Sequence, residues 1–90
     1  MKSYLIIYKL AFAEENYPNL LAYLKSATYW ARPMTNAWLI KATKNSAEIR
    51  DGILSRINKG DQILIIEVPN NNWATSAISK TVTDWMKANL

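Results

Sequence analysis

The hydrophobic pattern of the chain first indicates four β-strands. Residues 2–10 (KSYLIIYKL) and 61–68 (DQILIIEV) are apolar on both faces and rich in β-branched and aromatic residues, which predicts strands. Residues 37–42 (AWLIKA) predict a third strand, separated by a bend at 35–36 from a shorter one with the sequence YWARPM. Because Pro33 cannot donate a ladder hydrogen bond, we expect this shorter strand at an edge of the sheet.

Three other segments repeat their apolar residues with the spacing of a helix. The first helix is expected at 17–27, with Pro18 in its first turn. The second is capped by Asn45 or Ser46 and is followed by Gly60, which suits the C′ position. The apolar stripes are formed by Tyr17, Leu20, Leu21 and Leu24, by Ile49, Ile53, Leu54 and Ile57, and by Ile78, Val82, Trp85 and Met86 of a third, short helix at 78–89.

The predicted elements follow the order β-α-β-β-α-β, with a turn and a third helix after the last strand. This order is the signature of the ferredoxin-like split β-α-β fold, which belongs to the α+β class. Its antiparallel sheet has strand order 4-1-3-2 and carries both main helices on one face, which agrees with an edge position for the strand that contains Pro33. The 90 residues predict one domain, 1–90, in which Pro69 and the asparagines at 70–72 form a turn and residues 70–90 are a C-terminal extension.

This layout leaves one face of the sheet without a main helix. We expect Leu5 and Ile7 of the first strand and Ile63 and Ile65 of the last on that face, an apolar patch on the order of several hundred Å², which monomers rarely expose. A second copy of the sheet would cover it and give a two-fold homodimer, with the C-terminal extension packed on the partner. A monomer covered by its own tail is the alternative. The expected interface residues are Leu5, Ile7, Ile63, Ile65, Trp73 and Trp85.

The residue types that are missing narrow the chemistry. The chain has no cysteine and no histidine, which excludes disulfides, thiolate catalysis and the commonest zinc ligands. No apolar stretch approaches the ~20 residues that a membrane span needs. The run after Met1 is too short for a signal peptide, so we expect a cytoplasmic protein without membrane contact. The net charge of +4 is a mild bias toward anionic partners such as RNA or DNA, and we expect no cofactor.

Lys9 interrupts the apolar pattern at the end of the first strand. In the 4-1-3-2 sheet this end lies beside Asp61, so the simplest expectation is a Lys9–Asp61 ion pair at the sheet rim. The alternative is that two Lys9 side chains, one from each subunit of a dimer, form a contact for an anion or phosphate. Glu14 and Glu15 follow in the next loop, and we expect both to be solvated.

Other basic residues are scattered over the predicted elements. Arg32 lies on the edge strand, where it could reach a nucleic-acid backbone, although charges on edge strands also discourage further strand pairing. The candidate nucleic-acid contacts are Lys9, Arg32, Lys41, Lys44 and Arg50. Lys41, Lys44, Arg50 and Arg56 could form a band from the third strand to the second helix, for which a solvated surface is the simplest expectation. We assign no catalytic residue and no metal ligand.

Several stretches together resemble small bacterial and phage proteins that are labelled SinR-like. These stretches are YLIIYKL, YPNLLAYLKS, WARPMTNAWLIKAT, SAEIRDGI, GDQILIIEV and NNWATSAISKTVTDWMKANL, and they cover nearly the whole chain. In fold order and first strand, the chain is also similar to the CRISPR-associated spacer-acquisition endoribonucleases and to the virulence-associated ribonuclease toxins. These resemblances imply a ferredoxin-like dimer, a link to nucleic acid and a metal-dependent nuclease ancestry.

One departure from the nuclease-like relatives bears on activity. Those relatives close the first strand with a Tyr-Asp pair, and the two aspartates of a dimer hold a divalent cation, whereas here the pair is Tyr8-Lys9. A lysine cannot ligate Mg²⁺, which requires oxygen donors. We therefore expect a non-catalytic homodimeric module for binding or assembly, associated with nucleic acid in a mobile-element or defence context. The alternatives are a divalent-metal ribonuclease with another arrangement of carboxylates and a structural dimer that binds protein.

Overall fold

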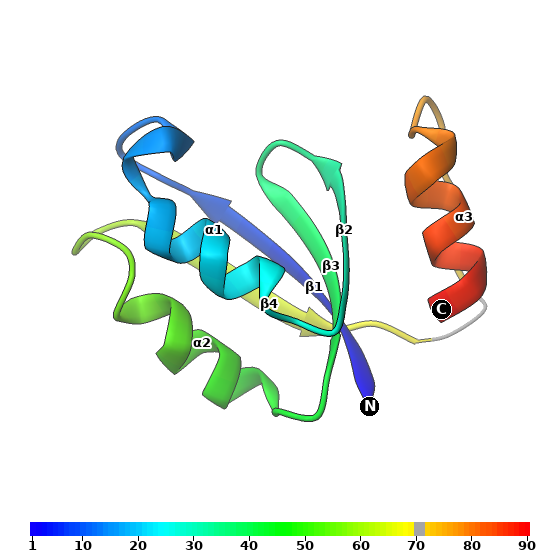
Figure 1. Cartoon of the computed structure of the whole chain (residues 1–90), viewed down its shortest axis with the longest axis horizontal. Coiled ribbons are helices and arrows are strands. Elements are labelled where there is room, and N and C mark those ends of the chain that lie inside the picture. Colours follow the sequence, from blue (N-terminus) through cyan, green and yellow to red (C-terminus); the bar gives the residue numbers. More distant parts are fainter. Residues whose placement is uncertain (70–71) are drawn as a thin grey trace.

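The computed structural model describes residues 1–69 and 72–90, and its elements follow the predicted order (Figure 1). They are β1 (Lys2–Lys9), the 3₁₀ helix η1 (Glu14–Asn16), α1 (Pro18–Lys25), β2 (Tyr29–Met34), β3 (Ala37–Ala42), α2 (Ser46–Leu54), β4 (Gln62–Glu67) and α3 (Lys80–Asn89). The turn predicted around Asn70 and Asn71 falls on residues that lie outside the described ones.

The four strands form one antiparallel sheet in the order β2-β3-β1-β4, which confirms the predicted order. The helices α1 and α2 cover one face of this sheet, and α3 lies against the other (Figure 1). As Pro33 predicted, β2 is an edge strand, and its pairing with β3 shifts register between Ala31 and Met34. The fold is therefore ferredoxin-like, with a third helix on the face that the two main helices leave open.

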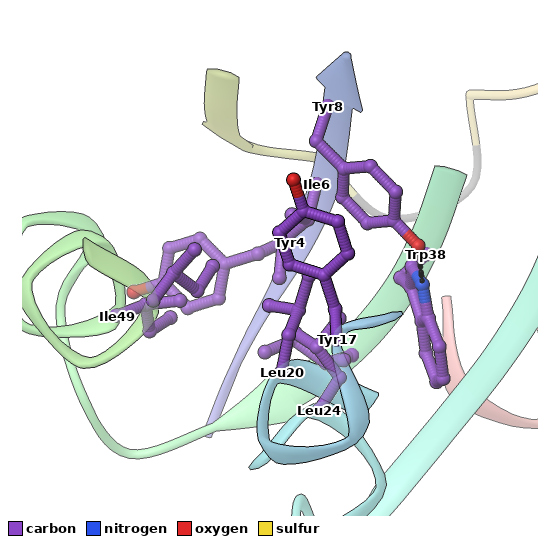
Figure 2. Close-up of a cluster of buried hydrophobic side chains, with 10 residues drawn as sticks. Tyr4, Ile6, Tyr8, Tyr17, Leu20, Leu24, Trp38 and Ile49 are labelled. Carbon is purple, nitrogen blue, oxygen red and sulfur yellow. Dashed lines mark hydrogen bonds between the residues drawn. The ribbon is translucent and has the colours of Figure 1, made fainter. Parts of the chain in front are cut away.

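The larger hydrophobic core lies between the sheet and the helices α1 and α2 (Figure 2). Its buried members are Tyr4, Ile6, Tyr8, Tyr17, Leu20, Leu24, Trp38, Ile40, Ile49 and Ile53. The polar atoms of the buried rings are paired, because the Tyr4 hydroxyl donates to the Lys44 carbonyl (2.8 Å) and Trp38 Nε1 donates to the Tyr8 hydroxyl (2.9 Å). The aromatic side chains can therefore fill this core without leaving these groups unsatisfied.

The second main helix is shorter than its apolar pattern predicted. Asn45 caps α2: its side chain accepts from the Glu48 amide (2.9 Å), and the Glu48 carboxylate accepts from the Asn45 amide (3.0 Å). The helix ends at Leu54, well before Gly60, because the chain then turns toward β4 and the Asp61 carboxylate accepts a backbone hydrogen bond from that turn (2.9 Å). Gly60, with φ of +93°, serves this turn, so its expected role at the helix C′ position was wrong.

Strand register decides which residues of β4 face the helices. Ile63 and Ile65 pair with Tyr8 and Ile6 across the β1–β4 ladder, so they pack against the larger core. The prediction that Ile63 and Ile65 belong to the open face was therefore wrong. Cross-strand partners share a face, and in a strand that is apolar on both faces the sequence pattern does not say which face is inside.

The face opposite α1 and α2 is only partly covered. Its smaller core consists of Ala31, Leu39, Val82 and Met86, with Leu5, Val68, Trp73, Ile78, Trp85 and Leu90 packed around them. Toward the β4 edge, Leu64 and Ile66 remain 53% and 47% exposed. In the single chain, the C-terminal segment with Trp73 and Trp85 thus covers part of its own sheet and leaves the side chains of β4 on this face open.

Replacement of Ile53 by alanine tests the assignment of the larger core. Ile53 is fully buried (0% exposed), whereas its neighbour Leu54 is 51% exposed. We expect Ile53→Ala to lower the free energy of unfolding by ~2–5 kcal/mol through the cavity that it leaves. Leu54→Ala, the matched control, should change it by less than about 0.5 kcal/mol. Urea denaturation measures both, and equal effects would contradict the orientation of α2.

Candidate nucleic-acid interface

Basic and aromatic side chains gather at one end of the sheet. Here the connection from α1 to β2 lies beside the connection from β3 to α2, near the N-terminus of β1 (Figure 1). We call this region the basic–aromatic end, and it consists of Tyr23, Lys25, Tyr29, Trp30, Lys41, Lys44 and Arg56. Residues distant in sequence meet here because both connections of a ferredoxin-like unit return at the same end.

Tyr23 is the centre of this region. Its ring centroid lies 5.3 Å from Nζ of Lys44 and 4.4 Å from the guanidinium carbon of Arg56. Arg56 is held in place because its Nη1 donates to the Gly52 carbonyl oxygen (2.6 Å). A Cβ built on Gly52 would stand only 2.2 Å from the Tyr23 hydroxyl oxygen. A glycine inside α2, which is unfavourable by ~1 kcal/mol relative to alanine, thus makes room for the Tyr23 ring.

Two further cation–ring pairs involve the start of β2. Nζ of Lys25 lies 5.9 Å from the Trp30 ring centroid, and Nζ of Lys41 lies 5.9 Å from that of Tyr29. Both distances fall within the ~6 Å reach of a cation–π interaction. Tyr29 and Trp30 are exposed, so rings and cations border the solvent together.

The ion pairs among the described residues involve other cations than those of the basic–aromatic end. The ion pairs are Lys2–Glu67, Arg32–Glu14, Arg50–Asp51 and Lys80–Asp84. Within residues 1–69 and 72–90, none of the four cations of the basic–aromatic end forms an ion pair. Their charge is therefore not neutralised by a direct carboxylate contact, which favours anions at this surface.

The opposite end of the sheet differs from the sequence-based expectation. Lys9 is exposed and forms no ion pair with any described residue. The Asp61 carboxylate instead accepts from the Tyr17 hydroxyl (2.7 Å) and from the backbone amides of Ala11 (2.8 Å) and Asn58 (2.9 Å). Burial would raise the pKa of Asp61, but these three hydrogen bonds outweigh it and hold the pKa below its usual value. The predicted Lys9–Asp61 ion pair was wrong because nearer donors take the carboxylate.

Glu14 also departs from its expected role as a solvated charge. Its side chain is 21% exposed and accepts hydrogen bonds from the Tyr8 hydroxyl and from Arg32 Nη2. The Arg32 guanidinium lies 4.6 Å from the Trp38 ring centroid, and Trp38 Nε1 donates to Tyr8 (Figure 2). Burial, followed by the hydrogen bond to Glu14, raises the pKa of Tyr8 to about 12, so this phenol stays protonated near neutral pH. Arg32 is therefore part of this internal network.

Of the five basic residues singled out from the sequence, only Lys41 and Lys44 lie at the basic–aromatic end, Lys44 over Tyr23 on the helix side and Lys41 over Tyr29 on the other face of the sheet. Lys9 and Arg32 lie toward the opposite end of the sheet. Arg50 is exposed on α2 and pairs with the adjacent aspartate at 3.0 Å. These three residues therefore do not belong to the basic–aromatic end.

Sequence reasoning missed most of this region. The residues it missed are Tyr23, Lys25, Tyr29 and Trp30. A signal was present in the segments KSATYW and KATK, which flank the two connections that the ferredoxin-like order brings to one end of the sheet. Of the basic band considered from the sequence, Arg56 reaches Tyr23 because α2 ends before it, whereas Arg50 does not.

The described residues include neither a metal-ligand cluster nor a membrane-spanning helix. No group of three or more carboxylates that could hold a metal ion occurs within residues 1–69 and 72–90. In the same part of the chain, no helix has both the length and the apolar character that a bilayer crossing requires. What the basic–aromatic end can do chemically is attract anions and stack planar rings.

Comparisons with known proteins assign no family. The chain matches no protein-family model, no curated protein and no solved structure. The resemblance to SinR-like proteins therefore stays a prediction from the sequence.

Removal of the Glu14 carboxylate tests the internal network at the Lys9 end. In Glu14→Ala, the half-buried Arg32 guanidinium and the Tyr8 hydroxyl each lose a partner. We expect the free energy of unfolding to fall by ~1–3 kcal/mol, the usual effect of leaving a desolvated polar group unpaired. Glu15→Ala, which alters the exposed neighbour, should change it by less than about 0.5 kcal/mol. If chemical denaturation gives the same small change for both, Glu14 is solvated after all.

Proposed function

We propose that this chain is a nucleic-acid-binding module that meets RNA or DNA with its basic–aromatic end. The observation that carries the proposal is the set of four cations without ion-pair partners among the described residues, each lying over an aromatic ring. Lysine and arginine neutralise backbone phosphates, and exposed aromatic rings stack on bases with little dependence on sequence. The same surface therefore offers both halves of a nucleic-acid contact.

The proposed role is to bind nucleic acid without cleaving it. Lys9 stands where the nuclease-like relatives carry a metal-binding aspartate. Glu14, a half-buried carboxylate in the loop after β1, already accepts hydrogen bonds from Tyr8 and Arg32. A metal ion placed at this end of β1 would compete with that network for its oxygen ligand. These observations favour a binding role over a divalent-metal ribonuclease.

A homodimer is the second part of the proposal. Leu64 and Ile66 are about half exposed on the face that α3 leaves open, and β4 has a single neighbour in the sheet. An edge strand with an apolar face is prone to pair with another chain. Packing of this open face against the same face of a second subunit, about a two-fold axis, would cover these side chains. The subunits then meet through Leu64 and Ile66 in place of Ile63 and Ile65.

Neutralisation of Lys41 and Lys44 tests the nucleic-acid contact. We expect the double variant Lys41→Gln/Lys44→Gln to weaken binding to single-stranded RNA and to flatten the plot of log K against log salt. The slope should change by about 1.4 if each lysine neutralises one phosphate of a single strand. Fluorescence anisotropy at several salt concentrations measures both quantities.

The control is Lys59→Gln/Lys87→Gln, which removes the same charge from exposed positions outside the basic–aromatic end. It should leave the slope nearly unchanged. An equal loss in both double variants would mean a diffuse charge effect. Absence of binding to RNA and DNA even at low salt would reject the proposed function and leave a structural dimer that binds protein.

Charge insertion at Leu64 tests the dimer. Leu64 on β4 and Leu54 on α2 are equally exposed, at 53% and 51%, but lie on opposite faces of the fold. We expect sedimentation velocity to show a dimer for the wild type and Leu54→Glu, and a monomer for Leu64→Glu, because a buried unpaired carboxylate is unfavourable. A wild type that sediments as a monomer at tens of micromolar would exclude this interface.

A further inference from the structure

We infer that the hollow beside Tyr23 is a seat for one pyrimidine ring of a single-stranded nucleic acid. This inference rests on the proposed function and deepens it, because it names the class of nucleic acid and the position of one base. Such a seat would make the module selective for single strands over duplexes, since a paired and stacked base cannot enter a hollow in the protein.

The hollow lies where the end of α1, the end of β3 and the start of α2 come together. Its inner wall is apolar and rigid, because Leu24, Ile40 and Ile49 belong to the larger core and are almost fully buried. Its rim carries Lys44, whose Nζ lies 5.3 Å from the Tyr23 ring centroid, whereas Lys41 extends over Tyr29 on the opposite face of the sheet. An apolar wall with a cation at the mouth matches a nucleotide, whose base is planar and whose flanking phosphates are charged.

The size of the hollow favours a single six-membered ring. Its volume is about 160 Å³. An apolar protein cavity of about 150 Å³ is known to hold benzene. A pyrimidine is a ring of the same size, whereas the second ring of a purine would have to stay outside the hollow. The geometry thus disfavours adenine and guanine at this position.

The polar groups at the rim suit a pyrimidine without distinguishing uracil from cytosine. Thr28 and Thr43 both line the hollow and are exposed. A threonine hydroxyl is donor and acceptor at once and rotates to suit its partner. It can therefore satisfy the carbonyl of uracil or the amino group of cytosine, and we expect both bases to be accepted.

The path of the strand follows from the neighbouring surface. A second hollow, which includes Arg56 and Asn19, shares Tyr23 and Ser26 with the first. A chain with one base seated in the first hollow can pass over Tyr23 toward Arg56, whose guanidinium provides the next phosphate contact. The cations of the two hollows then neutralise successive phosphates of one strand.

Filling the hollow tests the inference. Ala42 and Ala27 are half-buried residues that line it and pack against the larger core. In wild-type protein, fluorescence anisotropy with labelled oligouridine, oligocytidine and oligoadenosine of equal length should show a preference of about tenfold for the pyrimidines, the order expected for one stacked base. An RNA duplex should bind more weakly than either pyrimidine strand.

Flexible pyrimidine strands can bind better for reasons of their own, so the decisive comparison is between variants. Ala42→Leu and Ala27→Leu should each reduce the pyrimidine preference to within about twofold of none. Ala88→Leu, on the exposed surface of α3, should keep it. Circular dichroism establishes whether each variant is folded. Because two independent substitutions fill the hollow, the comparison can still be made if one of them prevents folding.

The outcomes separate this inference from the proposed function. A pyrimidine preference that persists in both folded filling variants would overturn the seat, while sensitivity to Lys41→Gln/Lys44→Gln would still support the basic–aromatic end. Equal affinity of the wild type for oligouridine and oligoadenosine would also overturn the seat alone. Absence of binding to every oligonucleotide at low salt would overturn both.

Discussion

The antiparallel register of β1 between β3 and β4 is the constraint on which the rest of the structure depends. Because cross-strand partners share a face, the register sets Tyr4, Ile6 and Tyr8 against α1 and α2 and aligns Ile63 and Ile65 with them. The alternate residues of the central strand then point the other way and are also apolar. A sheet of this kind needs cover on both faces, which is why α3 packs where a minimal ferredoxin-like unit has nothing.

The two ends of the sheet differ in how their charged side chains are paired. At the end where β1 finishes, Glu14 is held between Tyr8 and Arg32, and Asp61 collects three hydrogen bonds. These two carboxylates are satisfied inside the protein and stabilise the loop after β1. At the other end, the cations lie over aromatic rings and none is paired with a carboxylate among the described residues. That contrast is the physical basis for placing an anionic partner at the second end.

The contact between Gly52 and Tyr23 links the fold to this surface. A residue with a side chain at this position of α2 would collide with the Tyr23 ring, so the helix accepts the weaker propensity of glycine. The ring is thereby fixed between two cations and beside the hollow that opens on Ile49 and Leu24. A rigid aromatic wall loses little conformational entropy when a base stacks near it, which suits a recognition surface.

The amino-acid sequence by itself determined the element order, the edge position of β2 and the ferredoxin-like topology, because apolar period, Pro33 and the Asn45 cap are local signals. The sequence also singled out Lys41 and Lys44 as candidate nucleic-acid contacts. Only the tertiary structure decided that Ile63 faces the helices and Leu64 the solvent, since a strand that is apolar on both faces carries no record of its register.

The grouping of residues in the candidate site likewise could not be read from the sequence alone. Tyr23, Lys44 and Arg56 are far apart in the chain and meet only because α1 crosses α2 at Gly52 and α2 ends before Arg56. The partners of Glu14 and Asp61 depend on hydrogen-bond donors in a loop whose path no periodic pattern describes. The order of the elements can be predicted from the sequence because it depends on local propensity. Which charges are buried, paired or exposed depends on packing between elements, which the tertiary structure determines.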